Sequence, residues 1–329
     1  MPSILSTVRS QATPLKTIAR ALESGRVHHA YLFEGPAGVG KELAAFGLAQ
    51  ALVCERRAEG SAKACGECSA CVRVVPKDGL SRHPDVVAIE RGLYDPAQIG
   101  RRSPETQDIS IDQIRTLVLA RAAFPPHEGK AKVFVIRRAE ELSISAANAL
   151  LKTLEEPGAR THFLLLTTQP DALLPTILSR TLRVHFGLLS DDTVEQILIA
   201  KGVEGDTKKI AALAEGSASR ALGLADPEER SVRDAFVARA TKAVEAPDAL
   251  LGLELAEEAK KDKGDLDAQL VELARHYSEE ARARAGANDA SATRAAARFQ
   301  AALTAIDELD KNGAAQLVME NMILKMRNA

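Results

Sequence analysis

The segment from residue 26 to 42 constrains the fold of this chain more than any other. A short apolar run at 31–33 predicts a strand, residues 43–52 have the composition of a helix, and the turn between them is rich in glycine. Its spacing, Gly-x4-Gly-Lys, is that of a P-loop, in which backbone N–H groups hold an anion and the lysine neutralises phosphate charge. The residues expected to form a nucleotide site are Gly35, Gly38, Gly40 and Lys41.

The position after the lysine departs from the P-loop pattern. Where a Ser or Thr hydroxyl would hold Mg²⁺, this chain has Glu42. We expect this carboxylate to repel bound phosphates. A tight turn without any ligand is the alternative interpretation, but the pattern favours a P-loop fold that has lost full nucleotide chemistry.

Composition narrows the class of protein. A chain of 329 residues with 46% apolar content can form two or three domains with proper cores. A net charge of −2 argues against a protein that wraps nucleic acid by itself. No apolar run approaches the ~18 residues of a membrane span, and the N-terminus lacks the apolar core of a secretory signal. We therefore expect a soluble, cytoplasmic protein with no membrane partner.

The cysteines predict a metal site. Cys54, Cys65, Cys68 and Cys71 have spacings of ten, two and two residues, which allow four sulfurs to surround Zn²⁺. An iron–sulfur cluster is the rival, although the fourth ligand followed by proline is missing, and buried thiols without metal are a third option. We expect a closed, structural zinc site in a module at 54–75. His83 is then structural, because four thiols already satisfy the metal.

Apolar segments alternate with helical ones through the first half of the chain. A capping box, Ser110 with Gln113, predicts a helix through Ala122, a second helix is expected at 148–154, and 91–107 is expected to be an exposed loop. This alternation predicts a parallel sheet covered on both faces, hence an α/β fold. The expected strands after the first lie at 86–89, 130–136, 163–168 and 182–186.

Beyond residue 187 the chain is expected to be helical. Apolar stripes at 266–277 and 319–326 have helical spacing and are interpreted as core. Four arginines in Ala-rich segments are interpreted as a solvated face. These are Arg282, Arg284, Arg294 and Arg298.

Several of these segments together resemble one family. HHAYLFEGPAGVGK at 28–41, the four cysteines, HPD at 83–85, ANALLKTLEEP at 147–157 and Ser179-Arg180 are similar, in order and spacing, to bacterial clamp-loader subunits of DNA polymerase III. The resemblance covers about residues 10–225. It implies an AAA+ P-loop domain with the zinc module, a helical lid, and an all-α collar through which five subunits form an open ring. The corresponding expected domains are 1–186, 187–228 and 229–329.

The departures from this family concern catalysis. Motor subunits have Asp-Glu after the strand that here ends at Ile136, where this chain has Arg137-Arg138. Guanidiniums cannot ligate a cation or accept a proton. Glu140 and Glu141 lie further on and are expected to point elsewhere. The resemblance is thus to a stator-type subunit without ATP hydrolysis of its own, with weak or absent ATP/ADP binding.

Other family residues are retained. Arg180 of Ser179-Arg180 matches an arginine that, in the family, reaches into the neighbouring subunit's nucleotide site, where it acts in trans. A surface salt bridge is the plain alternative for such an arginine. Arg220 matches a lid arginine that contacts phosphate, and Thr167 or Thr168 matches a sensor. Because no hydrolysis is expected here, these last positions are interpreted as vestigial.

Three classes of function follow from the sequence. The first is a non-hydrolysing clamp-loader subunit that joins gamma/tau and delta subunits in a hetero-pentameric ring, and meets the sliding clamp and primer-template DNA through the complex. The second is a catalytically active gamma/tau-type ATPase, which Glu42, Arg137 and Arg138 disfavour. The third is a zinc-ribbon nucleic-acid binder, which the acidic balance and few aromatics disfavour.

Overall fold

The computed structural model describes residues 3–99, 108–128, 130–261, 266–285, 290–310 and 313–329. The chain forms two compact units, Met1–Leu222 and Gly223–Ala329. Residues 187–222 therefore belong to the same unit as the P-loop, and a separate lid beginning at residue 187 stays a prediction.

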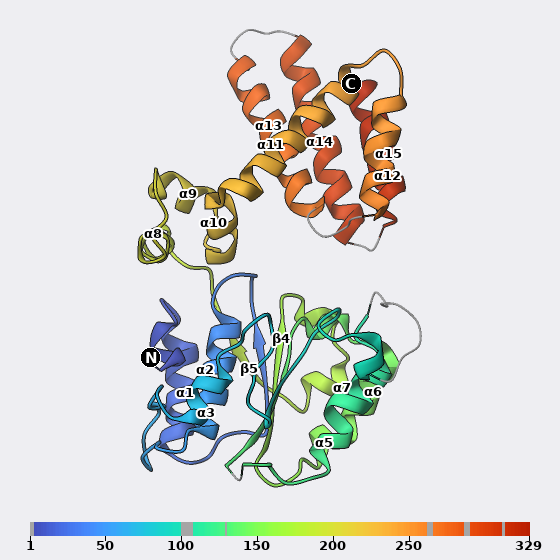
Figure 1. Cartoon of the computed structure of the whole chain (residues 1–329). Helices are drawn as coiled ribbons and strands as arrows, with labels where there is room; N and C mark the ends of the chain where they lie inside the picture. The colour runs from blue at the N-terminus through green and yellow to red at the C-terminus, as the bar shows by residue number, and fades with distance from the viewer. Residues whose placement is uncertain (1–2, 100–107, 129, 262–265, 286–289, 311–312) are drawn as a thin grey trace. The chain divides into compact units, whose positions relative to one another are not determined.

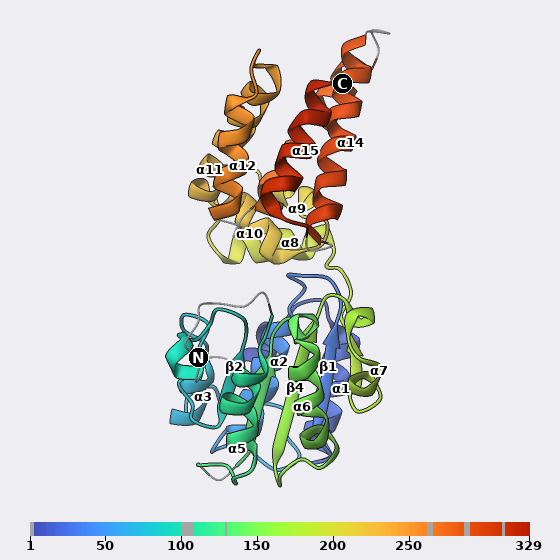
Figure 2. The same cartoon turned by 90° about the vertical axis from the view of Figure 1, so that its right-hand side faces the viewer.

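A five-stranded parallel sheet organises the first unit (Figures 1 and 2). The strand order is β2-β3-β4-β1-β5, so β1 lies between β4 and β5. All four pairings are parallel, which confirms the predicted sheet. The strands are β1 (Ala30–Glu34), β2 (Val86–Ile89), β3 (Lys132–Ile136), β4 (Thr161–Thr167) and β5 (Leu182–His185).

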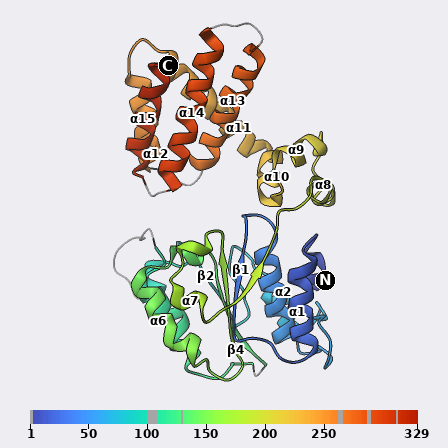
Figure 3. The ribbon, with the colours of Figure 1, turned by 180° about the vertical axis from the view of Figure 1, so that it is seen from behind.

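Helices cover both faces of this sheet (Figure 3). Because side chains alternate along a strand, Tyr31 and Phe33 pack into one core and Ala30 and Leu32 into the other. One face is covered by α1 (Ala12–Glu23), α2 (Lys41–Val53) and α3 (Ser69–Val74), the other by α4 (Ile111–Ile114), α5 (Ala120–Ala122), α6 (Ile144–Glu155) and α7 (Pro175–Leu178). A π-helical segment, Arg115–Leu119, joins α4 to α5. Short 3-10 helices occupy Ile4–Thr7, Pro96–Ile99, Ala139–Glu141 and Pro170–Ala172.

The predicted capping box is only half correct. The Ser110 hydroxyl accepts a hydrogen bond from the Gln113 N–H at 3.3 Å. The Gln113 amide, however, donates to the Glu90 carbonyl at 2.8 Å, which ties this helix to the end of β2. The expected loop at 91–107 contains the 3-10 turn ending at the buried Ile99, and its part at 100–107 lies outside the described residues.

The rest of the described chain is helical, as predicted. The first unit ends with α8 (Asp191–Ala200), α9 (Thr207–Leu213) and the start of α10 (Ala218–Ala225). The second contains α11 (Pro227–Glu245), α12 (Leu250–Lys261), α13 (Leu266–Arg284), α14 (Ala290–Asp310) and α15 (Ala315–Arg327). Within the described ranges, none of these helices has the length and apolar character needed to cross a membrane.

The core of the second unit confirms the two predicted stripes. Leu270, Tyr277, Met319 and Met326 are fully buried together. One arginine assignment is wrong, because Arg298 is not on a solvated face. Its side chain is 13% exposed, lies over the Tyr277 ring at 5.6 Å and donates to the Met326 carbonyl. The aliphatic part of the Arg298 side chain is packed against its neighbours, and its guanidinium is stabilised by the face of the Tyr277 ring. The sequence pattern alone had placed this charge in solvent.

Candidate nucleotide and metal sites

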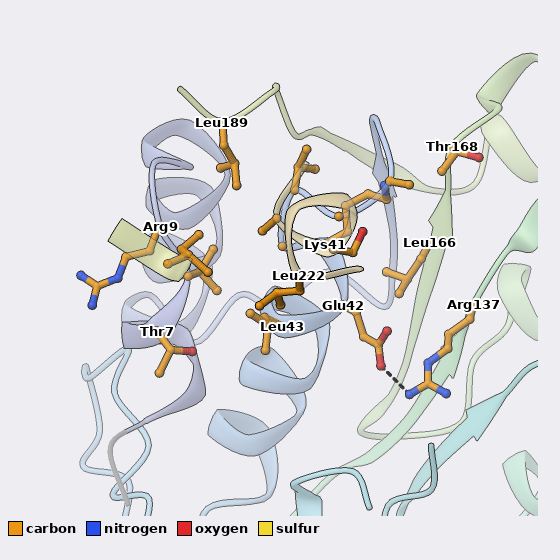
Figure 4. Close-up of a pocket in the computed structure, with 18 of the residues that line it drawn as sticks. Thr7, Arg9, Lys41, Glu42, Leu43, Arg137, Leu166, Thr168, Leu189 and Leu222 are labelled. Carbon is orange, nitrogen blue, oxygen red and sulfur yellow. Dashed lines mark hydrogen bonds and ion pairs between the residues drawn. The ribbon is translucent and has the colours of Figure 1, made fainter. Parts of the chain in front are cut away.

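A cavity of about 860 Å³ lies where the strands β2, β3, β4 and β1 end (Figure 4). Carboxyl ends of parallel strands meet at one edge of the sheet, which is where α/β proteins bind ligands. The walls come from the N-terminal segment, the P-loop, the residues after β2, β3 and β4, and the helices α8 and α10. Lys41 and the P-loop glycines Gly38 and Gly40 line this cavity.

The P-loop adopts a backbone that requires glycine. Gly35 has φ +138°, and a Cβ there would lie 2.1 Å from the Phe186 carbonyl oxygen. Gly38 has φ +73°, and a Cβ would lie 2.2 Å from the hydroxyls of Ser217 and Ser219. The Ala218 N–H donates to the Gly38 carbonyl at 3.0 Å, so the start of α10 packs directly on the loop.

Lys41 is held by its own loop. Its Nζ donates to the carbonyl oxygens of Gly35 at 2.6 Å and Pro36 at 2.5 Å. Burial disfavours the charged ammonium and lowers the pKa of Lys41 to about 8, against the opposing attraction of Glu140. With a pKa of about 8, Lys41 is still mostly protonated at pH 7. An anion that binds at the P-loop must compete with the two carbonyl oxygens for its ammonium group.

Arg137 and Glu42, the two departures from the P-loop pattern, contact each other. Arg137 Nη2 lies 2.5 Å from Glu42 Oε1, and Nη1 lies 3.0 Å from Glu90 Oε2 and from the Gly79 carbonyl (Figure 4 shows the first pair). The guanidinium also lies 5.4 Å from the centre of the Phe46 ring. Glu42 was expected to repel bound phosphates. Its charge is instead paired.

The residues present do not fit the Mg²⁺ that a P-loop fold implies. The hydroxyl ligand is replaced by a carboxylate that already holds Arg137, and the side chain after β3 carries only N–H donors. Arg137 is 7% exposed and lies among the groups that would surround an ion. We therefore assign no metal chemistry to this cavity.

Glu140 does line the cavity, contrary to the expectation that it points elsewhere. One of its oxygens accepts hydrogen bonds from the Thr168 hydroxyl at 2.8 Å and the Thr168 N–H at 3.2 Å. Its other oxygen is buried without a hydrogen-bond partner among the described residues. Thr167 also lines the cavity, with its hydroxyl accepting from the Gln169 N–H. The turn at Ala139–Glu141 brings this carboxylate back, which sequence spacing did not indicate.

The two family arginines lie away from the cavity lining. Arg180 follows α7, and its guanidinium forms an ion pair with Glu155 while donating to the Thr176 carbonyl at 2.9 Å. Arg220 pairs with Glu215 at 2.6 Å. Neither is among the described residues that line the cavity, although Ser219, next to Arg220, is.

Several residues of the cavity were missed from the sequence. Arg9 and Lys201 add positive charge to its walls, and Glu90 holds Arg137. Nothing in the sequence near Arg9 or Lys201 signals this role. Glu90 could have been found, because Ile89 pairs with Ile136 across neighbouring parallel strands, which places the next residues, of opposite charge, side by side.

The four cysteines converge as predicted. Their sulfurs all lie within 4.8 Å of one another, with Cys54 to Cys65 at 3.6 Å and Cys65 to Cys71 at 3.8 Å. A tetrahedron of ~2.3 Å Zn–S bonds has edges of ~3.8 Å, so the sulfurs fit zinc. Hydrogen bonds from the backbone of Glu67 and Cys68 lower the pKa of Cys65 to about 6, whereas burial raises the pKa of Cys71. This set could hold a metal ion such as zinc.

The HPD motif fastens the cysteine segment to the sheet. The buried carboxylate of Asp85 accepts the N–H groups of His127 at 2.6 Å and Glu128 at 2.7 Å. Glu128 in turn forms a two-bond pair with Arg73 on α3 and lies 3.2 Å from His83 Nε2. The group of described residues that could hold a metal consists of the four cysteines, and His83 instead lies against Glu128, so its structural role stays a prediction.

The fold and the cavity define an AAA+ type α/β protein, with a P-loop, a parallel sheet and helices from α8 onward. A solved structure supports this fold. A DNA polymerase III gamma subunit-related protein from Thermotoga maritima superposes with a TM-score of 0.52 over 97% of this chain and 99% of that one, at 20% sequence identity. Identity this low speaks for the fold alone.

Sequence relatives specify the family. The model of the family described as DNA polymerase III, delta subunit, matches residues 10–190. The chain is 35% identical to DNA polymerase III subunit tau of Salmonella typhimurium over 68% of its length, and 42% identical to subunit delta' of Pseudomonas aeruginosa over 46%. It is 31% identical to subunit delta' of Bacillus subtilis over 67%. The matches span about one third, 41% and 60% of these relatives. The chain belongs to the clamp-loader family of DNA polymerase III.

Proposed function

We propose that this chain is the delta-prime, or stator, subunit of the DNA polymerase III clamp loader, and that it hydrolyses no ATP itself. The observation that carries this proposal is the pairing of Arg137 with Glu42 in the P-loop cavity. Both positions where a motor subunit would hold Mg²⁺ are used for an ion pair instead. Phosphoryl transfer relies on a Mg²⁺ ion that bridges the phosphates and neutralises the developing charge, so a cavity whose Mg²⁺ positions are taken by an ion pair is not expected to support it.

The chemistry of this subunit is performed in trans, through Arg180. The residue lies after α7, outside the lining of the chain's own cavity, with its side chain about one third exposed. Its hydrogen bonds to Glu155, Thr176 and Ser179 hold the planar guanidinium in one orientation. A guanidinium so positioned at a subunit boundary can contact two phosphate oxygens of a neighbouring nucleotide.

The partners follow from this role. The subunit joins gamma/tau and delta subunits in a hetero-pentameric ring, with the helices of 229–329 as the oligomerisation collar. It meets the sliding clamp and primer-template DNA through the complex. In the same proposal the four cysteines hold one structural zinc, and Arg220 and the P-loop residues are remnants of a nucleotide site with weak or absent ATP/ADP binding.

A gamma/tau-type ATPase is the second candidate, and one observation favours it. Glu140 places a carboxylate in the cavity, with one oxygen free of hydrogen-bond partners in the described structure. A base without a metal ion and its hydroxyl ligand would still lack the means to neutralise developing phosphate charge. If the first proposal holds, Glu140→Gln should therefore leave the ATP turnover of the isolated chain at background, as in the unsubstituted chain.

ATP turnover of the isolated chain separates the two candidates. We expect no hydrolysis above background. Steady turnover that disappears in Lys41→Ala and in Glu140→Gln would establish the motor-type function and refute the first proposal. Binding of ADP without turnover is compatible with the stator.

Reconstituted loaders test Arg180. With gamma/tau and delta added, Arg180→Ala should assemble normally but lower DNA- and clamp-stimulated ATPase and clamp loading. The loss is partial because the other motor sites keep their own neighbours, and Arg180→Lys should recover little because it lacks the planar fork. Arg20→Ala, an exposed arginine on α1, is the matched control. Unchanged rates in Arg180→Ala loaders would disprove the role in trans.

A further inference from the structure

The two charge substitutions in the cavity form one unit. Glu42 lies in the first turn of α2 and Arg137 follows β3, 95 positions later, yet their side chains meet at 2.5 Å. Glu90, after β2, approaches the same guanidinium at 3.0 Å. One positive charge thus lies between two carboxylates, and the three side chains come from three different elements.

The surroundings hold the guanidinium in this place. The Arg137 side chain is 9% exposed, and it contacts the Gly79 carbonyl and the Phe46 ring in addition to the two carboxylates. Removing the arginine would leave the carboxylates of Glu42 and Glu90 facing each other beside a cavity that also contains Glu140. Carboxylate oxygens in such an arrangement bind hard divalent cations.

We infer that the Arg137 guanidinium is a tethered cation that takes the place of a divalent ion between Glu42 and Glu90. It neutralises part of the carboxylate charge, and it excludes metal by occupying the space and the oxygen atoms that an ion would need. An anion that reaches Lys41 is therefore bound without metal. This inference deepens the proposed loss of hydrolysis, but it rests on contacts within this chain and needs no partner subunit.

Binding of Mn²⁺ to the full-length, zinc-loaded chain tests the tethered cation, with electron paramagnetic resonance as the readout. We expect Arg137→Ala to bind Mn²⁺ about tenfold or more tightly than the unsubstituted chain, a difference that corresponds to one decade in the dissociation constant. The added Mn²⁺ should also raise the melting temperature of Arg137→Ala and leave that of the unsubstituted chain unchanged.

Controls assign the new site to the two carboxylates. Arg138→Ala removes the neighbouring arginine, which is exposed and pairs with Glu141, and should gain no Mn²⁺ binding. Arg137→Ala combined with Glu42→Gln should lose the gain. If Arg137→Ala does not fold, Arg137→Gln, which keeps most of the side-chain volume, carries the same test.

Two results would overturn the inference. One is binding of Mn²⁺ by the unsubstituted chain with a strength that Glu42→Gln reduces, since the arginine would then not exclude metal. The other is a folded Arg137→Ala or Arg137→Gln chain with no gain in Mn²⁺ binding. Neither result depends on ATP turnover, so failure of this inference is distinct from failure of the proposed function.

Discussion

We predict that the buried carboxylate of Asp85 is needed to attach the cysteine segment to the sheet. Its side chain is buried at 1% exposure, and its two oxygens accept the N–H groups of His127 and Glu128 at 2.6 and 2.7 Å. Glu128 then reaches Arg73 on α3. The perturbation is Asp85→Asn, which keeps the shape and removes the charge and one acceptor.

The magnitude follows from these two contacts. Hydrogen bonds to a charged group contribute about 1.5–3 kcal/mol each, and a buried donor left without a partner costs about 1–3 kcal/mol. The amide that replaces the carboxylate would retain one acceptor at neutral strength and direct its NH₂ at the other N–H. We therefore expect a loss of about 2–4 kcal/mol in the free energy of unfolding. For a unit of this size, 1 kcal/mol shifts the melting temperature by ~2–4 °C.

Calorimetry of the full chain measures this loss, with the transition of the first unit as the readout. Asp95→Asn is the matched control, because Asp95 is exposed and should change stability by less than about 0.5 kcal/mol. Asp85→Asn should also speed the release of zinc from the cysteine segment to a chelator. A melting temperature within about 1 °C of that of the unsubstituted chain would refute the reasoning.

Three further predictions concern the cavity and the cysteines. Cys71→Ser should abolish binding of one zinc per chain and destabilise the 54–75 segment, because binding and folding of such sites are coupled; metal analysis without added zinc tests this, and an iron–sulfur absorption band would contradict it. The pKa of Lys41 is lowered from 10.5 to about 8, so the unfolded chain holds this proton more tightly. The free energy of unfolding should therefore gain a contribution as pH rises from 8 to 10.5, seen as the difference from Lys41→Met in urea titrations; parallel pH profiles would contradict it. Gly38→Ala should cost more stability than Gly60→Ala. Both glycines have positive φ, but of the two only at Gly38 would the added Cβ have atoms within 4 Å. Equal losses of stability in thermal unfolding would show that α10 moves away from the P-loop at little cost.

Local sequence patterns were enough to predict several parts of this protein. The P-loop turn, the four cysteines and the strands could be predicted because each depends on residues within one short segment, where spacing sets geometry. The five predicted strands form a single parallel sheet, and the sulfurs of the cysteines lie within 4.8 Å of one another. Burial stripes of the last helices were predictable for the same reason, since helical periodicity fixes which side chains share a face.

Contacts between distant segments were decided only by the tertiary structure. The sequence identified Glu42 and Arg137 as separate losses, but α2 and the end of β3 bring them into one ion pair with Glu90. Glu140 enters the cavity because the chain turns back after β3, and the Arg298 side chain is only 13% exposed because α15 and the Tyr277 ring cover much of it. Electrostatic and packing energies depend on distances through space, and a sequence gives these only within a few residues.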